Sequence, residues 1–174
     1  MTKWLALLLF DLKIKVLNRL VSMKLEQKIP PVAVFLLSAF FMVVTTKVAR
    51  NVSVEYQYKF EALILFLLLG VGIAVIGVAS FKKHKTSVHP IKTERVVSLV
   101  TSGVYQYSRN PMYVGMLLCL VGIGLYTANP INVVFILLFV WYMNKYQIIP
   151  EEAFLTDKFG ASYIEYMKTV RRWL

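Results

Sequence analysis

A run of 20 residues without a charge, residues 62–81, constrains the fold of this chain more than any other feature. At about 1.5 Å per residue, a helix of this length crosses a hydrocarbon core of roughly 30 Å. Three further apolar runs occupy residues 32–46, 112–128 and 131–146. Backbone groups in lipid must be paired within their own segment, so such runs form helices. The sequence therefore predicts an all-α integral membrane protein with about four transmembrane helices.

The two ends of the chain are amphipathic rather than uniformly apolar. Residues 1–29 place leucines on one helical face and Asp11 and Lys15 on another, which predicts a helix lying in the membrane interface. After Pro150, apolar residues alternate with acids and bases, which predicts a C-terminal amphipathic helix over residues 150–174. We expect this tail helix to lie against the membrane or to fold back over the polar segments.

Breaks in the pattern divide one membrane domain, residues 1–174, into five segments. These are an interfacial helix at 1–29, two spans within 32–81, a loop at 82–110, a helical hairpin at 111–149 and a tail helix at 150–174. Only Asn129 and Pro130 separate the last two apolar runs, so these helices must be antiparallel neighbours. Gly70, Gly72 and Gly77 predict close contact between the second span and another helix.

The basic residues predict an orientation in the membrane. The chain has a net charge of +11, and its lysines and arginines number six in 1–29, six in 82–110 and five from Lys145 onward, against three in 47–61. The positive-inside rule then places both termini and the 82–110 loop in the cytoplasm. Because these charges flank apolar runs, the lipid bilayer explains them, and we expect no nucleic-acid partner.

The segment at residues 97–113, VSLVTSGVYQYSRNPMY, gathers the groups best suited to binding. Tyr105 and Tyr113 offer aromatic faces, and Arg109 is a fixed cation. The antiparallel hairpin brings the start of the third span to the same depth as residues 146–152. A pocket that combines tyrosine rings with carboxylates suits a cationic, nucleotide-like ligand.

Each of these residues also has a purely structural interpretation. Glu151 and Glu152 follow a proline, and acids at a helix start gain about 0.3 to 1 kcal/mol each from the helix dipole. Arg109 suits a membrane-interface anchor, and the tyrosines suit an interfacial aromatic belt. His84 and His89 lack cysteine or acidic partners, so no metal site is expected.

Two motifs, LVTSGVYQYSRNPMYVG at 99–115 and EEAFLTDKFGASYIEYMKTVRRW at 151–173, flank the hairpin. In this order they resemble the isoprenylcysteine carboxyl methyltransferase and phospholipid methyltransferase superfamily, in particular its bacterial members. The resemblance covers roughly residues 85–174. It implies a membrane enzyme that binds S-adenosylmethionine in a pocket formed by the last two spans and the tail.

Carried over by motif position, the resemblance implies a set of cofactor contacts. These are Val97, Leu99, Val100, Tyr105, Asn110, Pro111, Tyr113 and Glu151. The candidate catalytic residues are Glu151, Glu152, Arg109 and Arg172. The glutamates would anchor the cofactor or orient the acceptor, and the arginines, with Arg171, would attract a carboxylate or phosphate.

The sequence departs from the prenylcysteine enzymes at two positions. Asn110 stands where those enzymes have histidine, and Gln147 stands where they often have arginine. The resemblance then implies that a contact to the cofactor's carboxylate is either weaker in this chain or supplied by Lys145 or Arg109. The expected function is methyl transfer to a lipophilic acceptor that enters from the bilayer. A prenylcysteine carboxylate, a phospholipid amine and a small thiol remain open as acceptors, and a non-catalytic membrane scaffold is the alternative of another class. The sequence indicates no oligomeric state.

Overall fold

The computed structural model describes residues 29–83 and 98–174, and within these stretches every regular element is a helix. The elements are α2 (Pro31–Val48), η1 (Arg50–Val52), α3 (Lys59–Lys83), η3 (Gly103–Gln106), α4 (Pro111–Thr127), α5 (Asn132–Tyr142), η4 (Met143–Ile148), α6 (Ile149–Phe159) and α7 (Ala161–Thr169). The all-α prediction is confirmed for these residues. The predicted interfacial helix at 1–29 lies outside them except for its last residue, as does the middle of the 82–110 loop.

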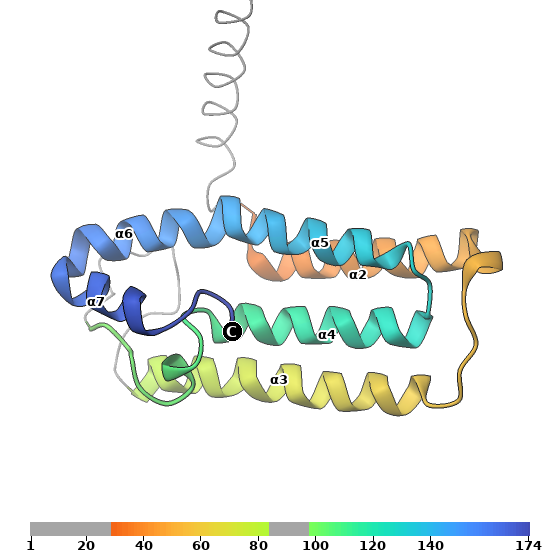
Figure 1. Ribbon diagram of the computed structural model, residues 1–174, viewed down its shortest axis with the longest axis horizontal. Helices are drawn as coiled ribbons and strands as arrows, with labels where there is room; N and C mark the ends of the chain where they lie inside the picture. The colour runs from red at the N-terminus through yellow and green to blue at the C-terminus, as the bar shows by residue number, and fades with distance from the viewer. Residues whose placement is uncertain (1–28, 84–97) are drawn as a thin grey trace, which may run out of the picture.

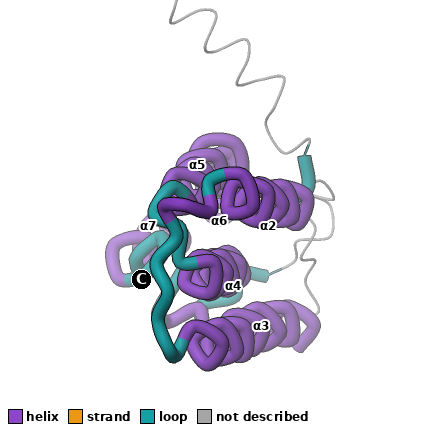
Figure 2. Tube along the Cα trace, turned by 90° about the vertical axis from the view of Figure 1, so that its right-hand side faces the viewer, coloured by secondary structure: helices purple, strands orange, loops and turns teal. Residues whose placement is uncertain are grey.

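Helix α4 lies at the centre of the bundle, between α3 on one side and α2 and α5 on the other (Figure 1, Figure 2). The short helices α6 and α7 gather at the end where α4 begins, and the C-terminus reaches the same place. The turn from α4 to α5 lies at the opposite end. The two helices are therefore antiparallel, as the Asn129–Pro130 break predicts.

Helices α3 and α4 approach closely because small residues face one another. A Cβ atom added to Gly70 would collide with the carbonyl oxygen of Gly115, and one added to Gly77 would lie 3.0 Å from Cγ of Met112. A Cβ atom added to Gly72 would have nothing within 4 Å. Glycine-mediated packing is thus confirmed at Gly70 and Gly77, whereas the prediction is wrong for Gly72.

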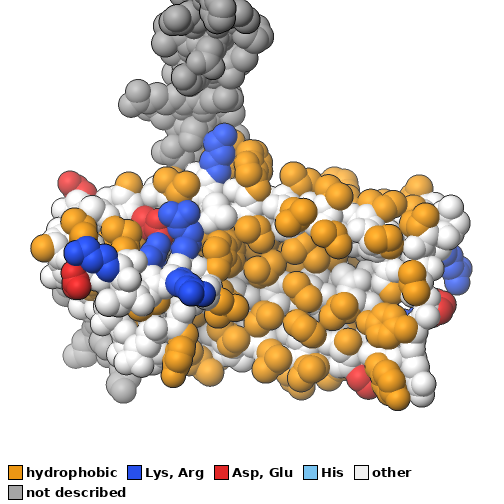
Figure 3. Space-filling view, in the orientation of Figure 1, with side chains coloured by type: hydrophobic (Ala, Val, Ile, Leu, Met, Phe, Trp, Pro, Cys, Tyr) orange, Lys and Arg blue, Asp and Glu red, His pale blue; other side chains and the backbone are white. Residues whose placement is uncertain are grey.

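Three described helical segments are long and apolar enough to cross a membrane, namely Pro31–Val48, Lys59–Phe81 and Asn132–Phe159. Helix α4 is also apolar but has 17 residues. Hydrophobic side chains cover the long middle of the molecule, whereas charged side chains gather at its two ends (Figure 3). Large apolar residues remain exposed on α2, α3 and α5. This distribution suits lipid, since soluble proteins rarely expose continuous apolar surface on this scale.

The C-terminal third departs from the prediction of one tail helix over residues 150–174. Helix α5 passes directly into the π-helix η4 and then into α6, so the rod continues past Pro150. Proline fits there because it occupies the first turn of α6, where its missing N–H is tolerated. Gly160 adopts a φ of +53°, which reverses the chain into α7. The tail is therefore two short helices followed by the non-helical residues 170–174.

The main buried core extends from the middle of the bundle to the end where α4 begins. Its members are Met42, Tyr113, Leu120, Phe139, Met143 and Ile148. Tyr113 lies near the start of α4 and Ile148 at the end of η4. Because both belong to one close-packed cluster, the segments before α4 and after η4 are held in fixed positions relative to each other.

At the opposite end, amides and hydroxyls join α2, α4 and α5. The side-chain amide of Asn132 donates to Thr46 Oγ1 at 2.9 Å and to Thr127 Oγ1 at 2.8 Å. The amide of Asn129 donates to the carbonyl of Ala49 at 2.9 Å. Asn129 and Asn132 are only 3% and 1% exposed. These bonds pair polar groups whose burial would otherwise be costly, and they fix the hairpin against α2.

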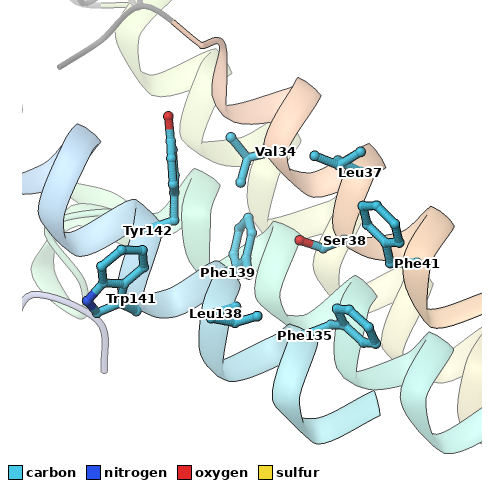
Figure 4. A pocket seen from close by; sticks show the side chains of 9 residues that line it. All are labelled: Val34, Leu37, Ser38, Phe41, Phe135, Leu138, Phe139, Trp141 and Tyr142. Carbon is cyan, nitrogen blue, oxygen red and sulfur yellow. The ribbon is translucent and has the colours of Figure 1, made fainter. Parts of the chain in front are cut away.

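An apolar groove of about 300 Å³ lies between α2 and α5 (Figure 4). Its lining residues are Val34, Leu37, Ser38, Phe41, Phe135, Leu138, Phe139, Trp141 and Tyr142. The lining extends to Tyr142, the last residue of α5, and η4 follows directly toward Glu151. The groove thus extends toward the end of the bundle that holds the carboxylates.

Candidate active site

The candidate site lies where the start of α4, the start of α6 and the C-terminal residues meet (Figure 1). Asn110 immediately precedes α4, and its side-chain amide donates to the carbonyl of Arg172 at 2.9 Å. Its backbone N–H donates to Ser108 Oγ at 3.1 Å. Pro111 is fully buried and begins α4, where its missing N–H costs little. The Asn-Pro pair therefore starts the helix and also binds the C-terminal segment.

Glu152 forms a buried ion pair with two arginines. Arg109 Nη2 donates to Glu152 Oε1 at 2.6 Å, and Arg172 donates to the same carboxylate from Nε at 3.1 Å and from Nη2 at 2.5 Å. The side chains of Arg109 and Glu152 are 10% and 12% exposed. Charge-assisted bonds are strong in such a setting, and each buried charge depends on its partners.

Glu151 faces different groups from its neighbour, because adjacent helical residues point about 100° apart. The hydroxyl of Tyr113 donates to Glu151 Oε1 at 2.8 Å. This is the one hydrogen bond to the Glu151 carboxylate from residues that the structure describes. Its second oxygen accepts no hydrogen bond from those residues and so retains acceptor capacity toward other groups.

Tyr105, in η3, is buried on the same side of the molecule. Its ring packs edge-to-face on Phe81 with centroids 5.2 Å apart, and its carbonyl accepts a bond from the Tyr166 hydroxyl at 2.6 Å. The Tyr105 hydroxyl is itself buried and has no partner within the described ranges. Burial, followed by the nearby Tyr166 and Glu151, raises the pKa of Tyr105, so this hydroxyl stays protonated at neutral pH. A buried hydroxyl in this state can donate to a bound ligand.

Two tyrosines of α7 support the site, although the sequence motifs alone did not single them out as site residues. Tyr163 and Tyr166 are 2% and 8% exposed and pack in one cluster with Leu99. Burial raises the pKa of Tyr166 to about 12, while Arg109 acts in the opposite direction. Tyr166 thus remains a donor to the Tyr105 carbonyl. The signal that identifies the pair is their i, i+3 spacing, which places both on one face of an amphipathic helix.

Residues 170–173, here called the strap, lie across the start of α4. The backbone N–H of Arg109 donates to the carbonyl of Arg171 at 3.0 Å. Trp173 Nε1 donates to Asn144 Oδ1 in η4 at 3.1 Å. The strap is therefore fixed to the loop before α4 and also to the rod that carries the two glutamates.

Gln147 and Lys145 make contacts away from these carboxylates. Gln147 is 1% exposed, and its amide donates to the carbonyl of Ile29 at 2.7 Å. Lys145 Nζ lies 5.4 Å from the ring centres of both Trp141 and Tyr146. Gln147 therefore anchors η4 to the chain just before α2, and Lys145 covers aromatic surface of α5 and η4.

The structure brings most of the predicted site residues to one place. They are Arg109, Asn110, Pro111, Tyr113, Glu151, Glu152 and Arg172. Leu99 packs against the α7 tyrosines, Val100 is 4% exposed, and Val97 lies outside the described residues. Of the three arginines expected to attract a ligand anion, Arg109 and Arg172 have Glu152 as their immediate partner. Glu151 and Glu152 also do not cap a free helix start, because η4 runs directly into α6.

The arrangement fits a cationic ligand that also carries hydroxyl groups. The second oxygen of Glu151 can accept from an ammonium or a hydroxyl, and the Tyr105 hydroxyl can donate. The rings of Tyr105 and Tyr113 tolerate a nearby positive charge. In the part of the chain that the structure describes, no three His, Cys, Asp or Glu side chains are grouped so as to hold a metal ion.

The fold and the site together define a helical protein with membrane-length apolar segments and a cluster of carboxylate, guanidinium and tyrosine side chains at one end of a hairpin. The model of the family described as Phospholipid methyltransferase matches residues 59–162, which is more than half of the chain. The matched region begins with α3, ends within α7 and contains Arg109, Glu151 and Glu152. The chain therefore belongs to the phospholipid methyltransferase family.

Individual proteins similar to the chain have a narrower description. Protein-S-isoprenylcysteine O-methyltransferase A of Arabidopsis thaliana is 32% identical over 107 residues, which cover 62% of this chain and 54% of the relative. A probable protein-S-isoprenylcysteine O-methyltransferase of Oryza sativa subsp. indica is 32% identical over 120 residues, covering 69% and 63%. The chain thus spans between half and two thirds of the length of these relatives. The resemblance seen in the two motifs is confirmed.

Proposed function

We propose that the protein is an integral membrane methyltransferase that uses S-adenosylmethionine to methylate a lipophilic acceptor. The observation that carries this proposal is the Tyr113–Glu151 pair at the entrance of the hairpin in a chain of this family. The relatives named as isoprenylcysteine O-methyltransferases support the reaction class. When bound, S-adenosylmethionine would supply a methyl group on a positively charged sulfur, which a nucleophile can displace.

Each residue of the pocket has a part in this proposal. Glu151 binds the ammonium or the ribose hydroxyls of the donor, and Tyr113 holds the carboxylate in the required direction. Tyr105 donates its hydroxyl and offers its ring to the cation. Asn110 and Pro111 shape the pocket floor at the start of α4, and Leu99, Val100 and Val97 contribute backbone and apolar surface. Holding two reactants in line can lower a barrier by roughly 7 to 11 kcal/mol, so the reaction needs no metal.

An apolar groove in the structure supports a lipophilic acceptor. The groove between α2 and α5 gives a hydrocarbon tail a path from the bilayer toward η4 and Glu151. A prenylated cysteine carboxylate is the first candidate, because the names of these relatives specify O-methylation of S-isoprenylcysteine. A phospholipid amine is the second, because the family carries that description. A small thiol, which needs no groove, is the third.

The proposed topology has four spans, with α4 as the third and with both termini and the pocket in the cytoplasm. The distribution of lysine and arginine supports it. Reporter fusions to the C-terminus and to the α4–α5 turn test this orientation at the bacterial inner membrane. A reporter active only inside the cell should work at the C-terminus and fail at the turn. The reverse result would place the pocket on the wrong side for a cytoplasmic donor.

The decisive experiment follows radiolabelled methyl transfer by the full-length protein in lipid nanodiscs. Wild-type protein is given labelled S-adenosylmethionine with a prenylated cysteine, phosphatidylethanolamine or a small thiol. The Glu151→Gln variant should lose about 30-fold or more in donor affinity, since removing one partner of a buried charged contact costs about 2 kcal/mol or more. Glu165→Gln, on the exposed face of α7, is the matched control and should behave as wild type. Donor binding and methyl transfer that are both absent from the wild type would favour the scaffold.

A further inference from the structure

The guanidinium of Arg109 is surrounded by acceptors that belong to the protein itself. Nη1 donates to the carbonyls of Met167 at 3.1 Å and Val170 at 2.7 Å, and Nη2 donates to Glu152 Oε1 at 2.6 Å. The side chain is 10% exposed, and Nε is buried without a partner in the described ranges. Three of the five guanidinium N–H groups are therefore bonded to acceptors within the protein.

These acceptors come from parts of the chain that are distant in sequence. Glu152 lies at the start of α6, whereas Met167 and Val170 lie at the end of α7 and at the start of the strap. The backbone N–H of Arg109 also donates to the carbonyl of Arg171. Arg109, a single residue in the loop before α4, therefore joins α6, which carries the glutamates, to the strap.

We propose that Arg109 is a positioning residue, which locks the strap over the pocket and fixes α6 through Glu152, and that it does not contact the methyl donor. The inference rests on the proposed function and assigns a new role within the same site. Glu151 and Glu152 are adjacent on α6, so fixing Glu152 also sets the direction in which Glu151 points. The fork geometry of arginine suits this task, because it can meet a carboxylate and two carbonyls at once.

Two roles for Arg109 predict different donor specificities. If Arg109 bound the donor's carboxylate, replacing Arg109 would lower the affinity for S-adenosylmethionine. The affinity for decarboxylated S-adenosylmethionine would not change. If Arg109 positions Glu151 and the strap, the affinities for both donors should fall by the same factor, because both donors need the same intact site. Comparing the two donors in one variant therefore separates contact from positioning.

The experiment uses the full-length protein in detergent and the variants Arg109→Gln and Arg109→Lys. Lys168→Gln, an exposed residue of α7, is the control with the same change of charge as Arg109→Gln. Carboxypeptidase release of the C-terminal residues reports on the strap, since cleavage follows the population of the open form. Release should be about tenfold faster or more in Arg109→Gln and unchanged in Lys168→Gln. Arg109→Lys should fall between them, because an ammonium cannot reproduce the fork.

Binding of the two donors completes the test. We expect equal losses for both donors in Arg109→Gln, and no further loss when Glu152→Gln is combined with it, because the two residues act as one unit. A loss confined to the donor with a carboxylate, or strap release at the wild-type rate, would overturn the proposal. If Arg109→Gln does not fold, the same comparisons in Arg109→Lys decide. If the wild type binds neither donor, the proposed function fails, while strap release still tests the role of Arg109.

Discussion

At the end of the bundle away from the candidate site, helices are joined by neutral groups, with Asn132 bonded to Thr46 and Thr127. At the site end, the segments are joined by charged groups, with Glu152 bonded to both Arg109 and Arg172. Both networks are largely buried and both connect elements distant in sequence. The neutral end closes a hairpin, whereas the charged end joins the loop before α4 to α6 and to the strap.

The difference indicates what each end has to do. Neutral amides and hydroxyls can be buried near lipid at modest cost once they are paired, so they suit a permanent joint. Buried charges cost more and are sensitive to any new charge nearby, so they suit a place where a charged ligand binds. An ion pair at the neutral end, Lys59 with Glu55, has a largely exposed glutamate and should add little stability.

The largest expected effect follows from removing the charge at the centre of the site network. Glu152→Gln leaves the buried cation of Arg109 without its counter-charge, so we expect a loss of about 3 kcal/mol in the free energy of unfolding. Thermal unfolding in detergent, followed by circular dichroism, measures it. Glu55→Gln removes the exposed acid at the opposite end and is the control, with an expected change of well under 1 kcal/mol. Equal effects of the two variants would erase the distinction between the ends.

A smaller effect is expected at the neutral end. Asn132→Ala removes the bonds to Thr46 and Thr127, and at about 1 kcal/mol each the loss of stability should be about 2 kcal/mol. Donor affinity should stay at the wild-type value, because the pocket lies at the other end of the bundle. Unfolding in detergent and equilibrium donor binding measure the two quantities. A loss of affinity in this variant would show that the ends are coupled.

Several features of this comparison could be predicted from the sequence. The uncharged run at residues 62–81 predicts a span, and α3 covers it. The short break at Asn129 and Pro130 predicts an antiparallel hairpin, which in turn brings Tyr113 next to Glu151. These predictions succeed because they depend on backbone pairing in lipid and on loop length, which are local properties of the chain.

The features that were missed depend on contacts made only in the folded state. The π-helix η4 lets the rod continue through Pro150, where the sequence suggested that the fourth span ends. Gly160 reverses the chain and brings the strap back to Arg109, and a glycine in a polar segment does not specify that direction by itself. The contacts of Arg109 with Met167, Val170 and Arg171 follow from this reversal.

The smallest expected effect comes from a substitution that separates donor affinity from the stability of the fold. Tyr113→Phe keeps the ring in the buried core and removes only the hydroxyl that donates to Glu151. Losing this bond should lower donor affinity about tenfold, which corresponds to about 1.4 kcal/mol. Tyr107→Phe, at a residue that is 75% exposed, is the matched control and should leave affinity unchanged. Calorimetric donor binding and thermal unfolding should then show the opposite pattern to Asn132→Ala, with affinity reduced and stability almost retained. If stability falls instead and affinity does not, the Tyr113–Glu151 bond is another structural joint, and the carboxylate that binds the donor must be sought elsewhere.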